Sequence, residues 1–199
     1  AKQLADTGVP LTSLAPRFIG EFQKGIDYIG DIAKFREDFV LHQAIADTFG
    51  YKLSVHSGSD KFSIYPSVAE LSKGHFHLKT AGTNWLEALR VVLAANPELF
   101  GQMYSYAKEH LDEAKAYYKV DVEKESVPDS VDAALFERPD VRQVMHITYG
   151  LLLNAKTETG EPLFRTRLYR CLRENEDLLR STVERHIDNH LKALGLIWS

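Results

Sequence analysis

The sequence predicts an α/β fold with few parallel strands and a large helical region in the second half of the chain. Two short β-prone segments, 51–56 and 75–80, each end in a polar, glycine-containing turn that leads into a helical pattern. A third β-prone segment, 11–15, precedes them. From Asn96 onward the apolar residues recur at helical spacing. This alternation predicts two successive βαβ units with neighbouring parallel strands.

Three strands are few for a chain of 199 residues. A complete (β/α)8 barrel has eight strands and takes about 250 residues. We therefore expect either a small sheet or the C-terminal portion of a larger TIM-like (β/α) barrel. Residues 1–96 would form the partial barrel segment that carries the site loops. Residues 97–199 would form a helical region packed on it within one domain.

Composition excludes several classes of protein. With 44% hydrophobic residues the chain can bury a substantial core, as one globular domain does. A net charge of −4 with scattered basic residues supplies no strong field for nucleic acid or an anionic membrane, so we expect neither partner. No apolar run approaches the ~20 residues that span a bilayer. The single cysteine, Cys171, fits a core position and a reducing compartment, so we expect a cytoplasmic protein.

The first half contains clear helix boundaries. Pro16 stops the first strand, and the glycine-rich and charged segment 16–31 is expected to be a long loop. Asp31 is an N-cap for a helix over 32–49, which Gly50 ends. Further helices are expected at 66–72 and 85–95, the second capped by Asn84.

The second half is expected to be helical, with polar connections. Apolar spacing predicts helices over the segments 97–118, 130–137 and 140–154, with irregular connections at 120–128 and 156–161. Pro162 then opens a long helical pattern that Gly195 ends. A helix of that length is expected either to be continuous or to break near Asn175 or Asp177.

Two histidines are the predicted metal ligands. His56 ends the second strand and His77 lies within the third, so neighbouring strands would bring two imidazoles to one ion. A carboxylate would have to complete such a site. His75, His77 and Lys79 alternate and therefore point to one side of their strand. The alternative is that these histidines are hydrogen-bonded to backbone and water.

The turns that follow the two strands carry polar side chains suited to an anionic or hydroxylated ligand. Ser57, Ser59, Asp60 and Lys61 follow the second strand, and Thr80 and Thr83 follow the third. Backbone N–H groups of such a loop beside a helix start can hold a carboxylate or phosphate. Neither turn has the spacing of a phosphate-binding loop or a dinucleotide fingerprint. The alternative is an ordinary strand-to-helix turn.

Charged residues of the long loop are further catalytic candidates. Lys24 could balance an anionic substrate, Asp27 could be a metal ligand or base, and Glu21 is another acid. A solvated loop is the alternative. His186 and His190 have the i, i+4 spacing of a helical zinc pair, but no Glu follows His186, so we favour an ordinary helix face there.

Three segments together resemble one family. PRFIGEFQKGIDYIGD, YKLSVHSGSDKFSIYP and HFHLKTAGTNWLEALR look like the tagaturonate epimerase family, which are metal-dependent hexuronate C4-epimerases. The resemblance covers about Leu11 to Val92, and HSGSDKF followed by HLKTAGT is its distinctive part. It implies a TIM-like barrel, a divalent cation (Zn, Mn, Co, Ni or Fe), a sugar-acid substrate and a chain longer than this one. A homo-oligomer, or pairing with an N-terminal part, would then cover open strand edges.

The chemistry that the resemblance implies is inversion at C4 of tagaturonate to give fructuronate, which a retro-aldol cleavage and re-addition would achieve. In that reading His56 and His77 hold the metal, and Lys24, Lys61 or Lys79 pairs with the carboxylate or assists proton transfer. Asp27 would be an acid/base group or a ligand. Two alternatives remain: another metal-dependent sugar isomerase or aldolase, and a non-catalytic helical assembly domain.

Overall fold

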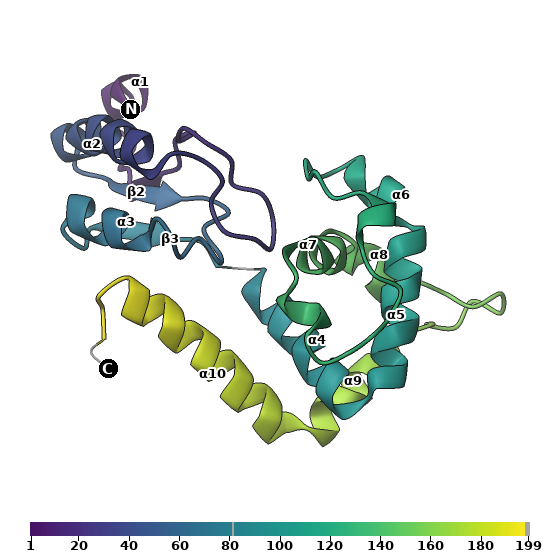
Figure 1. Ribbon diagram of the computed structural model, residues 1–199. Helices are drawn as coiled ribbons and strands as arrows, with labels where there is room; N and C mark the ends of the chain where they lie inside the picture. Colours follow the sequence, from purple (N-terminus) through teal and green to yellow (C-terminus); the bar gives the residue numbers. More distant parts are fainter. Residues whose placement is uncertain (81, 198–199) are drawn as a thin grey trace. The chain divides into compact units, whose positions relative to one another are not determined.

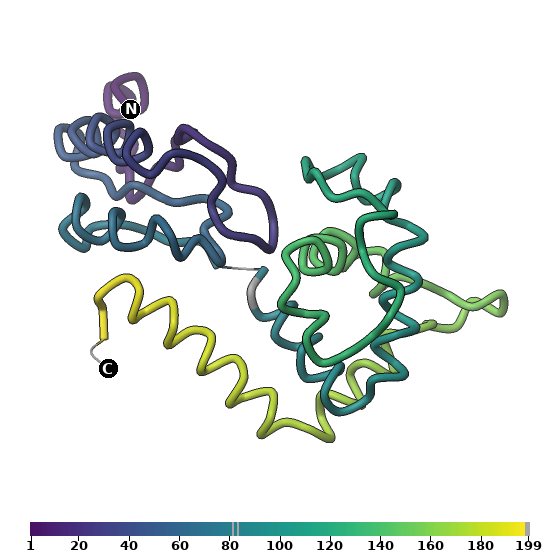
Figure 2. Tube along the Cα trace, viewed as in Figure 1, coloured from purple at the N-terminus to yellow at the C-terminus, as the bar shows by residue number. Residues whose placement is uncertain are grey.

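The computed structural model describes residues 1–80 and 82–197, apart from the side chain of Thr83 (Figure 1). The chain divides into two compact units. The described residues of unit 1 are 1–23, 27–80 and 188–197, and those of unit 2 are 24–26 and 82–187. Figure 2 traces the chain out of unit 1 after residue 80 and back into it through the last helix.

Unit 1 contains a three-stranded parallel sheet. The strands are β1 (Ser13–Leu14), β2 (Lys52–Val55) and β3 (Phe76–Leu78), in the order β1-β2-β3. Leu53 pairs with Leu14 on one side and with Phe76 on the other. The other elements of unit 1 are α1 (Lys2–Asp6), α2 (Ile32–Phe49) and α3 (Tyr65–Ser72). The predicted order of three neighbouring parallel strands separated by helices is confirmed.

Local signals set the ends of α2 as predicted. The Asp31 carboxylate accepts hydrogen bonds from the backbone N–H groups of Ala33 (2.8 Å) and Lys34 (3.2 Å). Gly50 adopts a left-handed φ of 69° at the other end, and its N–H donates to the Ala46 carbonyl. The helix buries one side against the core of unit 1.

The two faces of the sheet differ in chemistry because successive side chains alternate. Leu53 and Val55 of β2 belong to a buried cluster with Phe18, Tyr28, Phe35, Phe39, Ala46, Ile64 and Val68. Ser54 points to the opposite face, where it meets His77 of the neighbouring strand. One face therefore carries the core, and the other carries polar side chains.

Unit 2 is helical. Its elements are α4 (Thr83–Ala95), α5 (Pro97–Glu109), α6 (Leu111–Lys115), η1 (Lys124–Ser126), η2 (Leu135–Glu137), α7 (Pro139–Ile147), α8 (Tyr149–Asn154) and α9 (Arg165–Glu174). The last helix, α10 (Glu176–Ala193), begins in this unit and ends in unit 1. A second buried cluster includes Leu89, Phe100, Met103, Phe136 and Met145, and Cys171 belongs to it.

Three predicted helical segments are each broken into two helices, and each break has the same local cause. A polar side chain at the break bonds to the carbonyl four residues earlier: His110 Nδ1 lies 2.9 Å from the Tyr106 oxygen, and Thr148 Oγ1 donates to Val144 at 2.7 Å. Asn175 Nδ2 likewise donates to the Cys171 carbonyl at 2.8 Å. Such bonds compete with the helical ladder. The continuous helices over 97–118 and 140–154 were wrong, and the break near Asn175 is confirmed.

Two further expectations need correction. A helix over 130–137 was predicted, but regular structure there is limited to η2; the Asp132 side chain accepts from the Ala134 N–H at 2.8 Å and forms a local turn instead. Asn84 was expected to cap α4, yet that helix already begins at Thr83, with Gly82 at the N-cap position.

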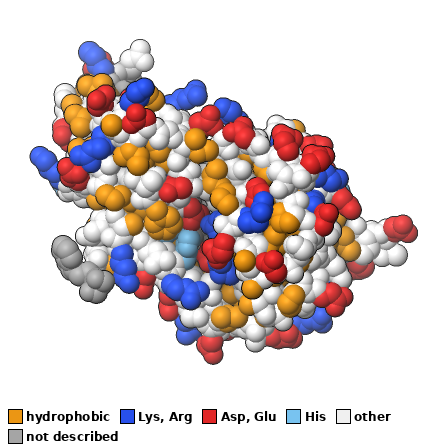
Figure 3. Space-filling model, in the orientation of Figure 1, with side chains coloured by type: hydrophobic (Ala, Val, Ile, Leu, Met, Phe, Trp, Pro, Cys, Tyr) orange, Lys and Arg blue, Asp and Glu red, His pale blue; other side chains and the backbone are white. Residues whose placement is uncertain are grey.

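Surface charge and hydropathy agree with the composition. Blue basic and red acidic side chains are interspersed over the face drawn in Figure 3, so no single-sign field covers it. Among the described residues, no helix is both long enough and apolar enough to cross a membrane.

Candidate functional site

The loop that follows β2 is strained and closely packed. Ser57 and Asp60 adopt φ angles of 57° and 60°, which are uncommon for residues other than glycine. Gly58 lies between them, and a Cβ there would be 2.5 Å from Leu78 Cδ1 and 2.8 Å from the Val55 carbonyl oxygen. Backbone strain of this kind is often maintained at functional sites. The loop is therefore the first component of the candidate site.

Lys61 is a fully buried residue of this loop. Its Nζ donates to the carbonyl oxygens of Gln23 (2.9 Å) and Ser59 (3.1 Å), and its backbone N–H donates to the Tyr65 hydroxyl (3.1 Å). That hydroxyl donates to the Gly58 carbonyl, and burial raises the pKa of Tyr65, so the phenol keeps its proton. Lys61 thus joins the loop after β2 to the end of the 16–23 segment.

The segment 16–31 is joined to α3 through Asp27. The Asp27 carboxylate accepts from the Ser63 N–H at 3.1 and 3.2 Å, from Ser63 Oγ at 3.0 Å and from the Tyr28 N–H at 2.7 Å. Glu21 accepts from Gln23 Nε2 at 2.7 Å. Both predicted acids are therefore engaged by neighbours within unit 1. Lys24 is half-buried and belongs to unit 2.

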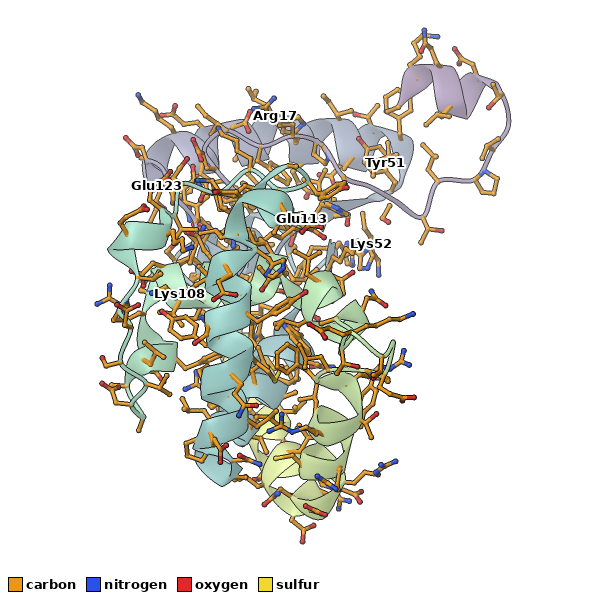
Figure 4. The ribbon with its side chains drawn as sticks, turned by 90° about the vertical axis from the view of Figure 1, so that its right-hand side faces the viewer. Arg17, Tyr51, Lys52, Lys108, Glu113 and Glu123 are labelled. Carbon is orange, nitrogen blue, oxygen red and sulfur yellow. The ribbon has the colours of Figure 1, made fainter. Side chains whose placement is uncertain are left out.

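The polar face of the sheet holds His77. Its Nδ1 lies 3.3 Å from Ser54 Oγ and 3.5 Å from Ser13 Oγ, so one imidazole bridges all three strands. His56 directly follows β2 at its carboxyl end, whereas Tyr51 and Lys52, labelled in Figure 4, mark the opposite end. Three predicted site residues are exposed: His56, His77 and Lys79. Their neighbour His75 is exposed as well.

The strongest group of metal-ligating side chains combines the loop after β2 with α10. Asp60 and His190, which both belong to unit 1, each offer one ligand atom, and these atoms lie within 4.8 Å of one another. An imidazole and a carboxylate are donors that suit a divalent transition metal. This group could bind a metal.

His190 is the residue that attaches the end of α10 to unit 1. It is 2% exposed, and its Nε2 accepts a hydrogen bond from the Asp60 N–H at 3.3 Å. The rings of Phe62 and Tyr65 lie 4.7 and 5.4 Å from its own, measured between centroids. Because Nε2 accepts, its lone pair faces Asp60, and a cation bound there would replace this long hydrogen bond.

The structure brings some of the predicted residues together and separates others. Ser57, Ser59, Asp60 and Lys61 share one loop, with the Lys61 ammonium directed into the protein rather than to solvent. Thr80 is half-buried after β3, and the side chain of Thr83 lies outside the described residues. Among the described residues, His56 and His77 are not grouped with Asp60 and His190. Their assignment as metal ligands stays a prediction.

Sequence reasoning gave too little weight to α10. The i, i+4 spacing of His186 and His190 was a usable signal, but the acidic partner is not a neighbour in sequence. Asp60 lies 130 residues before His190, so only the folded chain brings the two residues together.

Two cavities lie in unit 2, apart from the predicted residues. One of about 390 Å³ is lined by Ser105, Lys108, Glu109, Lys124, Glu125, Val127 and Asp129. Another of about 300 Å³ is lined by Ala95, Asn96, Arg167, Arg170, Cys171, Glu174 and Asn175. Neither of these two cavities is lined by a predicted site residue.

Comparison with known proteins gives a consistent result. Residues 1–194 match the family model described as UxaE, tagaturonate epimerase. The chain is 43% identical over 200 residues to the tagaturonate/fructuronate epimerase of Thermotoga maritima, an alignment that covers 97% of this chain and 40% of that protein.

Solved structures agree with the sequence match. The native crystal structure of fructuronate-tagaturonate epimerase UxaE from Cohnella laeviribosi superimposes with a TM-score of 0.93, and a complex with one glycerol gives 0.94. Both are 51% identical to this chain, with 98% of this chain and 41% of theirs covered. The chain thus spans about two fifths of the length of the relatives that it matches.

Proposed function

This chain belongs to the tagaturonate epimerase family, and we propose that it carries part of the site at which tagaturonate and fructuronate are interconverted by inversion at C4. The observation that supports this proposal most is the family match, which runs over residues 1–194 and includes both the loop after β2 and α10. The substrate would be a hexuronate, a sugar acid with one carboxylate, several hydroxyls and a ketone.

The position of the inverted carbon favours a particular reaction. C4 is β to the C2 ketone, so its hydrogen is not acidified as a C3 hydrogen would be. In a retro-aldol step a base removes the C4 hydroxyl proton, the C3–C4 bond breaks, C4 becomes an aldehyde and C3 joins the enolate of the ketone. Rotation of the aldehyde and re-addition of C3 to its other face inverts C4, and the alkoxide recovers the proton. No oxidant or reductant is consumed.

The chain's residues suit distinct tasks in this reaction. The exposed Lys79 at the carboxyl end of β3 would face the substrate carboxylate, and Ser57 and Thr80 would bind hydroxyls. Thr83 and Ser59 are further hydroxyl-binding candidates. Lys24, Asp27 and Glu21 are the proposed acid/base groups of the segment 16–31. Lys61 would act by holding the loop, because its ammonium is buried against carbonyl oxygens.

The family implies a divalent cation, and the carboxylate of Asp60 and the imidazole of His190, within unit 1, fit one. When bound, the cation would supply positive charge that stabilises an enolate oxygen. Asp60 and His190 would be two of its ligands. His56 and His77 remain the competing assignment, with His77 Nδ1 already beside two serine hydroxyls.

Cation titration separates the two assignments. Calorimetry with Mn²⁺ or Zn²⁺ would compare the chain with Asp60→Asn, His190→Gln, His56→Ala and His77→Ala variants, each shown to be folded by circular dichroism. Loss of binding in the first two, with the last two unchanged, would support Asp60 and His190. The reverse pattern would transfer the site to His56 and His77, and no binding by any form would exclude a cation site in this chain.

Product analysis tests the reaction. Tagaturonate would be incubated in deuterated water with the native protein that carries this chain, and the products followed by NMR. Fructuronate without solvent deuterium at C1 or C3 supports the retro-aldol route. Deuterium at either carbon would support the alternative of an isomerase that enolises its substrate. A protein that binds neither cation nor tagaturonate would fit a helical assembly domain.

The architecture is proposed to be part of a TIM-like (β/α) barrel. Three consecutive parallel strands alternate with helices, and the polar face with Ser54 and His77 would then line the barrel interior. Three further expectations stay predictions. They are a division of the chain at residue 96, a cytoplasmic location, and a homo-oligomer or a pairing with an N-terminal partner.

A further inference from the structure

Tyr65 is a fully buried tyrosine at the start of α3, and the proposed reaction does not use it. Its hydroxyl donates to the Gly58 carbonyl oxygen and accepts a hydrogen bond from the backbone N–H of Lys61 at 3.1 Å. Gly58 lies two residues before Asp60, and Lys61 directly follows it. One hydroxyl therefore closes the turn that contains Asp60, within unit 1.

The turn needs this closure because Asp60 is strained. Its φ of 60° is uncommon for a residue other than glycine, and such a conformation persists only where the surrounding structure holds it. A relaxed φ would turn both the N–H and the carboxylate of Asp60 in new directions. Because the Tyr65 hydroxyl bonds to the backbone on both sides of Asp60, it limits that relaxation.

The ring of Tyr65 contacts His190, the other member of the candidate pair. The two ring centroids lie 5.4 Å apart, and Phe62 lies 4.7 Å from His190 and 5.2 Å from Tyr65. His190 is 2% exposed, and its Nε2 accepts the hydrogen bond from the Asp60 N–H. Tyr65 thus contacts the loop through its oxygen and the imidazole through its ring.

A side chain that holds metal ligands without touching the metal commonly changes metal affinity about 10- to 100-fold when it is replaced. We propose that Tyr65 is a positioning residue that keeps Asp60 and His190 in one preformed arrangement for a divalent cation. The inference rests on the proposed cation site. Without the hydroxyl, the loop would have to become ordered as the cation binds, and that loss of entropy would lower the affinity.

Tyr28 provides a matched control within unit 1. It is also a buried tyrosine whose hydroxyl donates to a carbonyl oxygen, that of Ile19 at 3.1 Å. That carbonyl lies outside the loop after β2. Tyr65→Phe and Tyr28→Phe each remove one oxygen and keep the ring. The comparison therefore separates the general loss of a buried hydroxyl from the loss of the closure around Asp60.

Two measurements on these variants test the proposal. At about pH 8, where an ordinary imidazole is neutral, long-range ¹H–¹⁵N NMR reports the tautomer of His190, whose signals are identified from His190→Gln. Because Nε2 accepts from Asp60, we expect the proton on Nδ1 in the native chain and in Tyr28→Phe, and a mixture of tautomers in Tyr65→Phe. Calorimetry with Mn²⁺ or Zn²⁺ should show affinity lowered about 10-fold in Tyr65→Phe and unchanged in Tyr28→Phe.

A measurement on the native chain keeps the proposal testable if Tyr65→Phe does not fold. The Lys61 N–H should exchange with solvent deuterium much more slowly than the N–H of the exposed Glu158, because the Tyr65 hydroxyl accepts its hydrogen. Equal rates at the two positions would overturn the closure.

The positioning role and the cation site can fail separately. If the native chain binds no cation but the His190 tautomer changes in Tyr65→Phe, the cation site is lost and Tyr65 still positions the pair. If Asp60→Asn and His190→Gln abolish cation binding while Tyr65→Phe keeps the native tautomer and affinity, the cation site stands and the role of Tyr65 is overturned.

Discussion

The backbone N–H of Asp60 donates to Nε2 of His190 at 3.3 Å, across a separation of 130 residues. This single bond joins the loop after the second strand to the last helix of the chain. Asp60 is held at a φ of 60° and His190 is buried, so neither partner can be replaced by water without a rearrangement. Four predictions follow from this loop and from the burial of Tyr104.

Replacement of His190 by Ala should destabilise the chain. The change leaves the buried N–H of Asp60 without its acceptor and empties the space beside Phe62, so we expect a loss of about 1–3 kcal/mol in the free energy of unfolding. Denaturant unfolding would measure it. His75→Ala, at an exposed position, is the control and should change little. Equal stability of the two variants would show that the bond contributes nothing.

Gly58 should not accept a methyl group. Because its Cβ would lie 2.5 Å from Leu78 Cδ1 and 2.8 Å from a carbonyl oxygen, Gly58→Ala should cost about 1–3 kcal/mol, as other overpacked sites do. Thermal unfolding of the parent and the Gly58→Ala variant would measure this loss of stability. Gly150 in α8 has nothing within 4 Å of the same position, so Gly150→Ala should be neutral or slightly stabilising. A stable Gly58→Ala protein would contradict the packing of this loop.

Lys61→Met tests whether a buried ammonium supports the loop. Methionine fills similar space but leaves the carbonyls of Gln23 and Ser59 without this donor, so the expected loss is about 1–3 kcal/mol. Lys79→Met, on an exposed side chain, should stay within about 0.5 kcal/mol of the parent. Chemical denaturation of the parent, Lys61→Met and Lys79→Met would measure the three free energies of unfolding. If Lys79→Met proved the more destabilising, the structural role given to Lys61 would be wrong.

Alkaline stability should depend on Tyr104. Burial, with the nearby charge of Asp140, raises the pKa of Tyr104 from 10.0 to about 12. Between these values the unfolded chain has lost this proton and the folded chain keeps it, so stability falls as the pH rises through the window.

Tyr104→Phe should make that pH dependence shallower by up to about one proton. The variant also loses the hydrogen bond from the hydroxyl to the Pro128 carbonyl, at 2.8 Å, and should be slightly less stable at neutral pH. Urea unfolding from pH 9 to pH 12 measures both effects. Tyr117→Phe is the control because Tyr117 is 80% exposed. Parallel curves for Tyr104→Phe and the parent would refute the shifted pKa.

Local signals made much of the fold predictable. Asp31 and Gly50 act within one turn of their own positions, so the bounds of α2 could be predicted from sequence. The strand order followed from the alternation of β-prone and helical segments. The helix breaks at His110 and Thr148 were missed because the apolar spacing continues through them while one polar side chain bonds back to the preceding turn.

The candidate site was less predictable than the fold. The loop with Ser57, Asp60 and Lys61 was identified from its composition, but the direction of each side chain depends on packing. Lys61 was expected to contact an anion, and it bonds inward to two carbonyl oxygens. Spacing alone showed the pair His186 and His190, whereas Asp60 reaches His190, and Glu87 reaches His186, only through tertiary structure.

The return of α10 to unit 1 has a consequence for synthesis on the ribosome. Asp60 leaves the ribosome well before its partner His190, and at about 5–20 residues per second the interval is about 7–26 s. During that time the strained loop lacks its last hydrogen bond, and the neighbouring aromatic rings lack their cover. The loop after β2 is therefore made early in this stretch of the chain but completed only when α10 follows.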